Sequence, residues 1–433
     1  MPLFKQIPGL LLLLTFALTI VNAWVPIGVD WAQGGLMWLA GSMLFFSLAL
    51  NQKKIILTIA FFAMLSWVVA WITGETSGIV KALSANQLMI VMLIGVQFLQ
   101  LVALPVSEKN EPLPMGFKAF IRTYFGVHFF GAIINLSAVL LVADRLVKEA
   151  QLSMNQQKLL TRAFTSGAHW SPFFAAFAAS LVFTPDASLP IVMAVGMSMA
   201  SIALVVTLYE IKLNKSESID DFVGYPMRFD ALWLPVVLVL LVATTHNMFP
   251  AISVLILIAI CSLGLSVFVL LYRKGVVIAA TDFISYTMNR LPQMKNELLL
   301  FLVAGIFGSG LAAALDGLSI AIPFQHFDGI AASAILLLIF VLAIVGVHPV
   351  ISIAVIGHWI MSIEPNQTLL AIMFLMGWAI GVSASPISGI NLALHGRYGV
   401  SGRQIFKWNI SYALKVYACD CVILLITAHL LGV

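Results

Sequence analysis

Two Ser-Pro dipeptides, Ser171-Pro172 and Ser385-Pro386, lie about half a chain length apart, each inside an apolar stretch. Proline has no backbone N–H to donate and its ring clashes with the preceding turn, so each dipeptide predicts an interrupted helix. An interruption frees backbone groups: the amino end of a half-helix favours anions, and free carbonyls favour cations. The alternative is a packing kink whose hydroxyl groups bond their own backbone.

Hydroxyl, amide and glycine residues surround both dipeptides and are the groups expected to bind a solute or a coupling ion. The candidate residues are Ser166, Gly167, His169, Ser171, Pro172, Ser383, Ser385, Pro386, Ser388, Gly389 and Asn391. We expect a sodium ion near Ser171, Ser385 and Asn391, and no cofactor beyond Na⁺ or H⁺ as coupling ion. The three cysteines, Cys261, Cys419 and Cys421, show no metal-ligand spacing.

A Gly-Val-His tripeptide also occurs twice, beginning at Gly126 and at Gly346, and Pro349 follows the second copy. Histidine titrates near neutral pH, so His128 and His348 can carry a coupling proton or meet an anionic substrate. A structural histidine bonded to a carbonyl is the alternative. We expect both histidines to lie at turns where the chain reverses.

The elements that position these residues are predicted to be membrane helices. Hydrophobic residues make up 61% of the 433 positions and charged residues only 9%, unlike a water-soluble domain. Apolar runs long enough to span a bilayer predict about eleven crossings. They lie near 9–29, 32–50, 54–73, 86–105, 163–184, 188–209, 231–247, 250–272, 298–318, 366–395 and 408–431. The net charge of +4 does not indicate nucleic-acid binding.

Two further apolar stretches, 118–143 and 330–362, do not fit as single crossings. The second is too long, and counting the first as a crossing would move the basic residues between 145 and 162 outside the cell. Each is therefore predicted to be a re-entrant hairpin, which is tolerated where protein encloses it. With the N-terminus in the cytoplasm, Lys81 is then the basic residue expected outside.

Together these elements predict an all-α polytopic membrane protein with about eleven transmembrane helices plus two re-entrant hairpins in two inverted-topology repeats. The predicted segments are N-terminal scaffold helices (1–85), repeat 1 (86–209, with hairpin 118–143 and broken helix 163–184), a solvated cytoplasmic connector (210–230), scaffold helices with an interfacial amphipathic helix (231–297), and repeat 2 (298–433, with hairpin 330–362 and broken helix 366–395).

This arrangement favours a secondary active transporter that moves a small polar or anionic solute with Na⁺ or H⁺, surrounded by membrane lipids. A membrane-embedded enzyme using His169 or His348, or an exporter of a lipid-linked substrate, is the alternative. We do not expect an enzyme, because the polar residues lie at mid-depth rather than at one membrane face. No GxxxxGK[ST] motif for ATP binding occurs.

One C-terminal segment combines a Ser-Pro break that contains asparagine, a glycine-bearing turn and a basic residue before the last apolar run. It reads Ser385-Pro386-Ile387-Ser388-Gly389-Ile390-Asn391-Leu392, followed by Gly396, Tyr398-Gly399, Ser401 and Ile405-Phe406-Lys407. This pattern resembles the closing repeat of the ion transporter superfamily, which includes divalent anion/sodium symporters, citrate transporters and arsenite-type permeases.

The resemblance implies an elevator-type carrier, a homodimer in the bacterial cytoplasmic (inner) membrane, that binds substrate between two hairpin tips and two broken helices. The chain departs from the pattern at the tips. The Ser-Asn-Thr tips typical of the dicarboxylate symporters are absent, and Gly-Val-His stands at the aligned positions. The resemblance therefore predicts neither dicarboxylate specificity nor a choice between sodium and protons.

Overall fold

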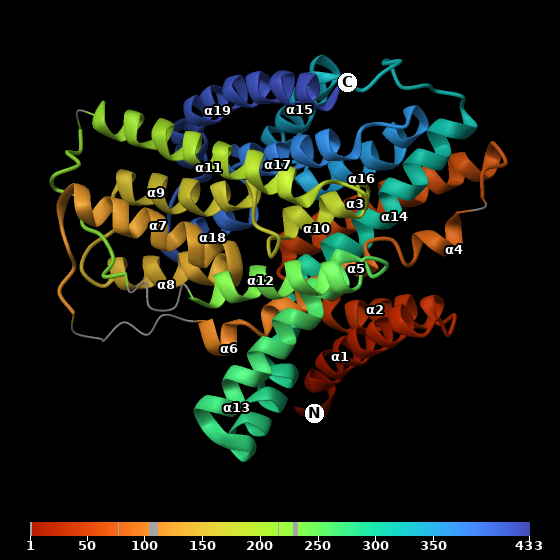
Figure 1. Ribbon diagram of the computed structural model, residues 1–433, viewed down its shortest axis with the longest axis horizontal. Helices are drawn as coiled ribbons and strands as arrows, with labels where there is room; N and C mark the ends of the chain where they lie inside the picture. Colours follow the sequence, from red (N-terminus) through yellow and green to blue (C-terminus); the bar gives the residue numbers. More distant parts are fainter. Residues whose placement is uncertain (1, 77, 104–110, 215, 228–232) are drawn as a thin grey trace. The chain divides into compact units, whose positions relative to one another are not determined.

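A computed structural model describes the chain except for residues 1, 77, 104–110, 215 and 228–232 (Figure 1). Its regular secondary structure is helical, and an isolated β-bridge joins Met115 and Val223. This confirms the predicted all-α polytopic membrane fold. The described helical segments long and apolar enough to span a bilayer are Gln6–Trp24, Leu50–Ile72, Ile79–Val102, Leu189–Lys212, Val254–Gly317, Gln367–Tyr398 and Gly402–Leu431.

The chain forms two compact units. Unit 1 comprises Met1–Val102, Val237–Gln325 and Val350–Glu364, and unit 2 comprises Ala103–Val236, His326–Pro349 and Pro365–Val433. The helices wholly or mostly in unit 1 are α1 (Pro2–Trp24), α2 (Asp30–Phe45), α3 (Leu50–Ile72), α4 (Ile79–Ala82), α5 (Gln87–Gln97), α6 (Gln100–Ala103), α12 (Trp233–Met248), α13 (Val254–Asn289), η3 (Leu291–Met294), α14 (Lys295–Gly317), α16 (Pro349–Ile360) and η4 (Met361–Ile363).

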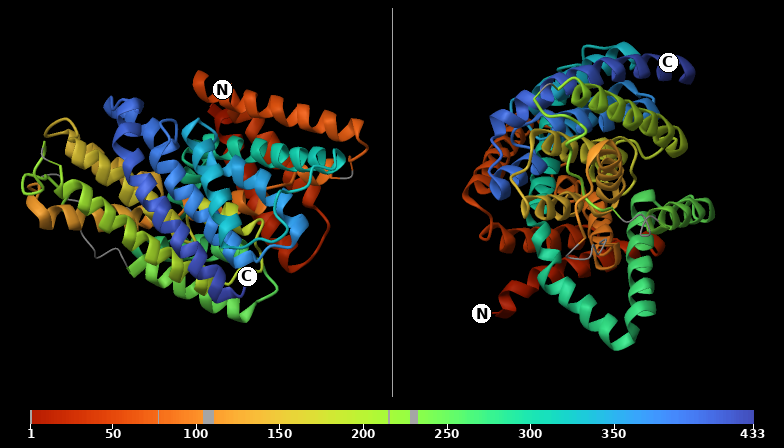
Figure 2. Two further views of the ribbon diagram at one scale, coloured as in Figure 1. Left: turned by 90° about the horizontal axis from the view of Figure 1, so that it is seen from above. Right: turned by 90° about the vertical axis from the view of Figure 1, so that its left-hand side faces the viewer.

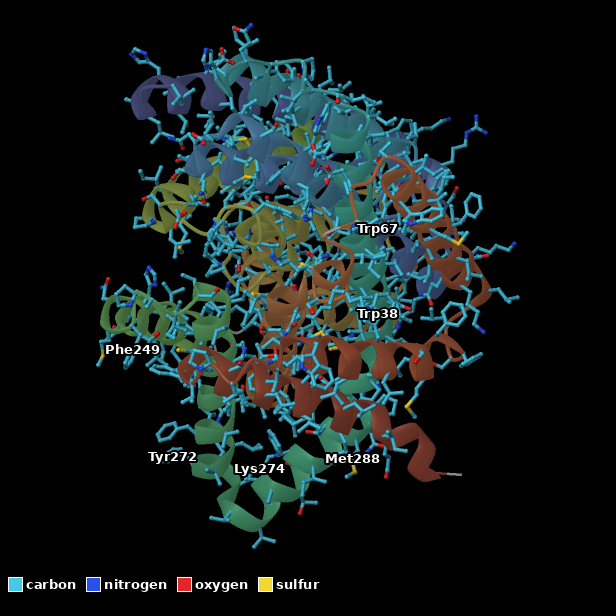
Figure 3. All side chains as sticks on the ribbon, turned by 90° about the vertical axis from the view of Figure 1, so that its right-hand side faces the viewer. Trp38, Trp67, Phe249, Tyr272, Lys274 and Met288 are labelled. Carbon is cyan, nitrogen blue, oxygen red and sulfur yellow. The ribbon has the colours of Figure 1, made fainter. Side chains whose placement is uncertain are left out.

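Unit 1 is built around close packing of α3 on α14. The indole Nε1 of Trp67 in α3 donates to the Ile306 carbonyl of α14 at 3.1 Å, and Figure 3 shows Trp67 between the two helices. The long helix α13 bends at Gly275, whose φ of 74° breaks the helical path (Figure 2). Tyr272, just before the bend, is 86% exposed, and Lys274 forms an ion pair with Asp282 after it at 2.6 Å. The interfacial helix predicted here stays a prediction.

Unit 2 packs most of its helices around α17. Its helices are α7 (Gly116–Ile134), α8 (Leu136–Val147), α9 (Met154–Ser166), η1 (Gly167–His169), α10 (Ala175–Leu181), α11 (Leu189–Lys212), α15 (Gly329–Ile344), α17 (Gln367–Ala384), α18 (Gly389–Tyr398) and α19 (Gly402–Leu431). Every residue of α17 from Thr368 to Ala384 is buried. A helix that is apolar on all sides is stable only when enclosed, so α17 forms the core of unit 2.

Residues 118–143 fold as two helices, α7 and α8, which reverse at Asn135, and we name this element hairpin 1. The Arg145 guanidinium donates to the Glu111 carbonyl at 3.0 Å, so both ends of hairpin 1 lie together. The prediction that His128 forms the turn is wrong, since His128 lies inside α7, about two helical turns earlier. In this copy the glycine, Gly126, keeps the helical conformation, whereas Asn135 has φ 53° and ψ −141°.

Residues 330–362 form α15 and α16, separated by a turn at 345–348 in which Gly346 has φ 107°. Here the Gly-Val-His copy does form the turn, because glycine tolerates positive φ and Pro349 begins the next helix. The division between the compact units falls directly after Pro349, so α15 and the turn belong to unit 2 and α16 belongs mostly to unit 1.

The connector predicted at 210–230 is less solvated than expected. The helix α11 continues to Lys212, and Phe222 and Tyr225 are 4% and 2% exposed. The Glu217 carboxylate accepts from the backbone N–H groups of Met154 and Asn155 at 3.0 and 2.8 Å. These are free donors of the first turn of α9, where a negative charge also complements the helix dipole. Sequence polarity alone does not reveal such capping by a distant segment.

We expect Gly196→Ala in α11 to lower stability by about 1–3 kcal/mol, because overpacking forces backbone shifts. A Cβ at Gly196 would lie 2.1 Å from the His169 carbonyl oxygen and 2.9 Å from the Trp170 Cα. Gly264→Ala is the matched control, since nothing lies within 4 Å of a Cβ there. Melting temperature in detergent measures both, and equal values for the two variants would contradict the packing described.

Candidate functional site

The helix that begins at Met154 is interrupted where the sequence predicts. Ser153 caps α9 reciprocally, with its Oγ accepting from the Gln156 N–H at 3.3 Å and the Gln156 Oε1 accepting from the Ser153 N–H at 2.9 Å. After Ser166 the helix tightens into η1, and 170–174, which includes Pro172, is not helical before α10 begins. We name residues 170–174 the first break.

Ser171 fastens the first break to hairpin 1. Its Oγ donates to the Ala132 carbonyl of α7 at 2.6 Å and accepts from the Phe173 N–H at 3.3 Å. The side chain is completely buried. The hydroxyl therefore both donates and accepts within the protein. It donates to another helix, α7, and accepts from a nearby backbone N–H of the first break.

His128 is held between Trp170 of the first break and Ser166 at the end of α9. The Trp170 Nε1 lies 3.0 Å from the His128 Nε2, and the Ser166 Oγ lies 2.8 Å from the Nδ1. An indole N–H can only donate, so Nε2 accepts and Nδ1 carries the proton. The Ser166 Oγ donates a hydrogen bond to the Ala163 carbonyl at 2.9 Å, and the Tyr124 hydroxyl lies 3.3 Å from the same Oγ. This network fixes a neutral imidazole.

His169 has one open ring atom. Its Nδ1 lies 3.2 Å from the Ser166 carbonyl, and its Nε2 is buried without a hydrogen-bond partner among the described residues. Gly167 lies between these two residues in the tight η1 turn. Of the candidate residues at the first break, His169 is therefore the one with an unused polar atom.

The second interruption separates α17 from α18, and we name residues 385–388, which include Pro386, the second break. The Asn391 Nδ2 donates to the Ser385 carbonyl at 2.8 Å and lies 3.3 Å from the Val382 carbonyl. It thereby satisfies carbonyls that the interruption leaves without a helical partner. Ser383 is satisfied separately, through a 2.8 Å bond to the Ile380 carbonyl.

Two polar atoms at the second break stay open. The Asn391 Oδ1 and the Ser388 Oγ are buried and have no hydrogen-bond partner within the described part of the chain. Gly389 begins α18 directly after Ser388. An amide oxygen, a hydroxyl and the amino end of α18 therefore face the same interruption, which is a donor and acceptor set for a polar ligand.

The turn between α15 and α16 packs on the second break. A Cβ at Gly346 would lie 2.9 Å from the Ile387 Cδ1, and a Cβ at Gly381 of α17 would lie 3.2 Å from the Pro349 Cγ. His348 contacts the Trp378 ring edge-on, with centroids 5.2 Å apart. The structure thus brings Gly346, His348 and Pro349 to the second break.

Unit 2 joins the two breaks through intervening helices. The Ser180 Oγ of α10 donates to the Ala371 carbonyl of α17 at 3.3 Å. The Tyr398 hydroxyl of α18 donates to Asp144 of α8 at 2.7 Å, and Arg397 forms an ion pair with the same carboxylate. Gly126 lies elsewhere, against the Met227 side chain. The hydrogen bonds described above form two groups of candidate residues, one at each break, rather than one cluster.

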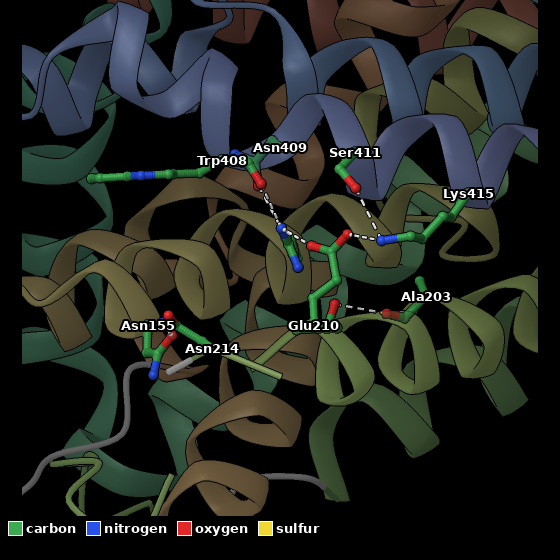
Figure 4. Close-up of polar contacts among 10 residues, drawn as sticks. Asn155, Ala203, Glu210, Asn214, Trp408, Asn409, Ser411 and Lys415 are labelled. Carbon is green, nitrogen blue, oxygen red and sulfur yellow. Dashed lines mark hydrogen bonds and ion pairs between the residues drawn. The ribbon is translucent and has the colours of Figure 1, made fainter. Parts of the chain in front are cut away.

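Sequence reasoning missed a buried charged network, drawn in Figure 4. Arg162 was assigned to a cytoplasmic segment, yet it is completely buried in α9. Its Nη2 donates to Glu210 of α11 at 2.7 Å, and its Nε donates to Asn409 of α19 at 3.0 Å. The guanidinium lies 4.4 Å from the centre of the Tyr412 ring, and Lys415 also donates to Glu210. This network fastens α9, α11 and α19 together.

The position of Arg162 gave one usable signal. It lies one helical turn before Ser166, on the same face of α9, and that face leads to the first break. Asp420, in the middle of α19, was also missed and is completely buried. Both charges stand at the edge of or inside apolar runs, where an ionisable residue is by itself a functional signal.

No protein-family model matches the chain, and no curated protein matches it in sequence. Among solved structures, the chain is similar to the Alcanivorax borkumensis YdaH transporter, described as having an unusual topology. The two share 14% sequence identity with a TM-score of 0.43, over 86% of this chain and 84% of the other.

We expect Glu210→Met to destabilise the protein by about 3–5 kcal/mol, because it leaves the buried Arg162 guanidinium without its counter-charge. Lys415→Met is the control, since the Lys415 side chain is 43% exposed and exposed pairs contribute about 0–1 kcal/mol. The double variant Arg162→Met/Glu210→Met is expected to melt above Glu210→Met alone. Melting temperatures in detergent measure all three, and a double variant less stable than Glu210→Met would show that Arg162 has a role beyond the pair.

Proposed function

We propose that this protein is a secondary active transporter that moves a small polar or anionic solute by symport with Na⁺ or H⁺. The observation that carries the proposal is the second break, where the Asn391 Oδ1 and the Ser388 Oγ are buried and have no hydrogen-bond partner among the described residues. A buried polar atom without a partner costs about 1–3 kcal/mol. A ligand that fills the break would recover that free energy, which is what a binding site requires.

The chemistry of the second break supports a solute with both polar and anionic character. The Asn391 oxygen accepts from a solute N–H or O–H group or contacts a cation such as Na⁺. The amino end of α18, which follows Ser388, favours a negative group. Na⁺ is placed in this proposal near Ser385 and Asn391, with Ser171 at the first break as a further candidate.

An elevator-type mechanism fits the division of the chain into two compact units. Unit 2 contains both breaks, hairpin 1 and the turn at 345–348, so we assign it the moving, solute-carrying role. Unit 1 takes the role of scaffold. The repeat boundaries predicted from the sequence, a homodimeric assembly, a place in the ion transporter superfamily and a bacterial inner membrane with the N-terminus in the cytoplasm are parts of the same proposal.

The test uses purified protein in liposomes, an imposed Na⁺ or pH gradient, and radiolabelled acetate, succinate, citrate and glutamate as probes. Gradient-driven accumulation of at least one probe is expected.

Ser388→Ala should reduce this accumulation about 10-fold, which corresponds to the loss of about 1.4 kcal/mol of binding free energy. This variant removes an open hydroxyl without breaking an internal bond, so folding should persist. Ser201→Ala in α11 is the control, because the Ser201 side chain is exposed and bonds its own helix at Met197. Wild-type accumulation by Ser388→Ala would contradict the site assignment.

A second prediction concerns the tip of hairpin 1. Asn135 adopts φ 53° and ψ −141°, a conformation that costs about 1–3 kcal/mol for a residue other than glycine. Asn135→Gly should therefore keep or raise the melting temperature. If the tip takes part in binding, the same variant loses probe accumulation. Glu364→Gly, at an exposed position with φ 48°, is the control for relief of strain alone. Full accumulation by Asn135→Gly would leave the tip with a purely structural role.

A further inference from the structure

Asp420 is an acidic residue enclosed by the helices of unit 2. It lies in the middle of α19, in the row of residues that this helix buries, with Tyr412, Val416 and Leu424. Its exposed fraction is 0%. Neither carboxyl oxygen has a hydrogen-bond partner among the described residues, in contrast to Glu210, whose two oxygens both accept from cations.

The helices that pack on α19 bring no counter-charge to Asp420. α15 and α17 contain no titratable residue at all. Glu210, in the last turn of α11, is engaged by Arg162 and Lys415. The remaining titratable groups on the neighbouring helices and on α19 itself are Lys158 of α9, Tyr209 and Lys212 of α11, His395, Arg397 and Tyr398 of α18, and Arg403, Lys407, Tyr412, Tyr417, Cys419, Cys421 and His429 of α19.

Several of these groups contact residues other than Asp420. The Arg162 guanidinium lies over Tyr412, about 12 Å along the helix from Asp420 at 1.5 Å per residue. The Tyr417 hydroxyl donates to the Ser333 carbonyl at 3.2 Å, and its ring stacks on Phe340. Arg397 and Tyr398 bind Asp144.

An ionised carboxylate in such surroundings would cost several kcal/mol, because neither water nor a counter-charge would stabilise it. The carboxyl therefore holds a proton or a metal cation. A metal ion of this kind needs several oxygen ligands. The hydroxyl side chains of α15 and α17 are Ser333, Thr368 and Ser383, and each is already hydrogen-bonded. A proton needs no further ligand.

We propose that Asp420 is the proton-binding site that couples this transporter to a proton gradient. The carboxylate takes one proton from water on one side of the membrane, is enclosed as the neutral acid in the conformation described here, and returns the proton to water on the other side. This coupling role rests on the proposed transport function, whereas the protonated state of Asp420 follows from its surroundings alone.

The protonated state is tested by dicyclohexylcarbodiimide, an apolar reagent that adds across a protonated carboxyl and rearranges to a stable N-acylurea without a leaving group. The full-length protein in detergent is treated at low and high pH, and the α19 peptide is analysed by mass spectrometry. An adduct on Asp420 that decreases several-fold as the pH rises is expected, with none in Asp420→Asn. Asp282→Asn, at an exposed ion pair, should label α19 like the wild type. Absence of an Asp420 adduct at every pH would overturn the proton site.

Coupling is tested in liposomes with acetate, succinate, citrate and glutamate as probes. Asp420→Asn is expected to exchange an accepted probe without a gradient at the wild-type rate, but to lose accumulation driven by a pH gradient about 10-fold. Asp420→Glu should retain part of that accumulation because it keeps a titratable carboxyl. Equal pH-driven accumulation by wild type and Asp420→Asn would overturn the coupling role. Labelling of Asp420 with no uptake of any probe by the wild type would overturn the transporter proposal and leave the proton site standing.

Discussion

The constraint on which unit 2 depends is the need to satisfy backbone groups where a buried helix is interrupted. Proline removes a donor at each break, and the neighbouring carbonyls lose their helical partners. At the first break, Ser171 joins the chain to the Ala132 carbonyl of hairpin 1. At the second break, Asn391 reaches back to the end of α17. Hairpin 1 and α18 therefore lie where they do partly because the interruptions require a partner.

Burial of charge imposes a second constraint, and the chain meets it in two opposite ways. Arg162 is completely buried but has Glu210, Asn409 and a tyrosine ring around it. Such a network joins α9, α11 and α19, and the loss of one partner is costly because it leaves a buried charge unpaired. Asp420 of α19 has no hydrogen-bond partner among the residues that the structure describes. A buried residue that lowers stability and makes no hydrogen bond to another helix is more readily explained by function than by folding.

The parts of this fold that could be predicted are those set by covalent structure and by hydropathy. Pro172 and Pro386 lack the backbone N–H that a helix interior needs, and long apolar runs require an apolar environment. The position of the reversal in hairpin 1 could not be predicted, because the backbone conformation of Asn135 is unusual for any residue other than glycine. The ion pair that buries Arg162 could not be predicted either, since Glu210 is distant in sequence and charge counting treats every arginine as solvated.

Similar sequence motifs at the two breaks do not produce similar hydrogen bonding. The two Ser-Pro dipeptides are alike in sequence and each interrupts a helix, but the hydrogen bonding of the polar atoms around them differs. Ser171 and the imidazole of His128 are fully hydrogen-bonded within the protein. Asn391 and Ser388 each keep an atom that nothing in the described chain satisfies.

A bound ligand can recover the cost of an open buried polar atom, so this difference favours an asymmetric site. The second break would supply the direct contacts to the solute. The first break, tied to hairpin 1 through Ser171, would form the fixed wall, with the Nε2 of His169 as its open polar atom. The two breaks thus differ in their internal hydrogen bonding: Ser171 at the first is fully bonded, whereas Ser388 and Asn391 at the second each keep an atom without a partner among the described residues.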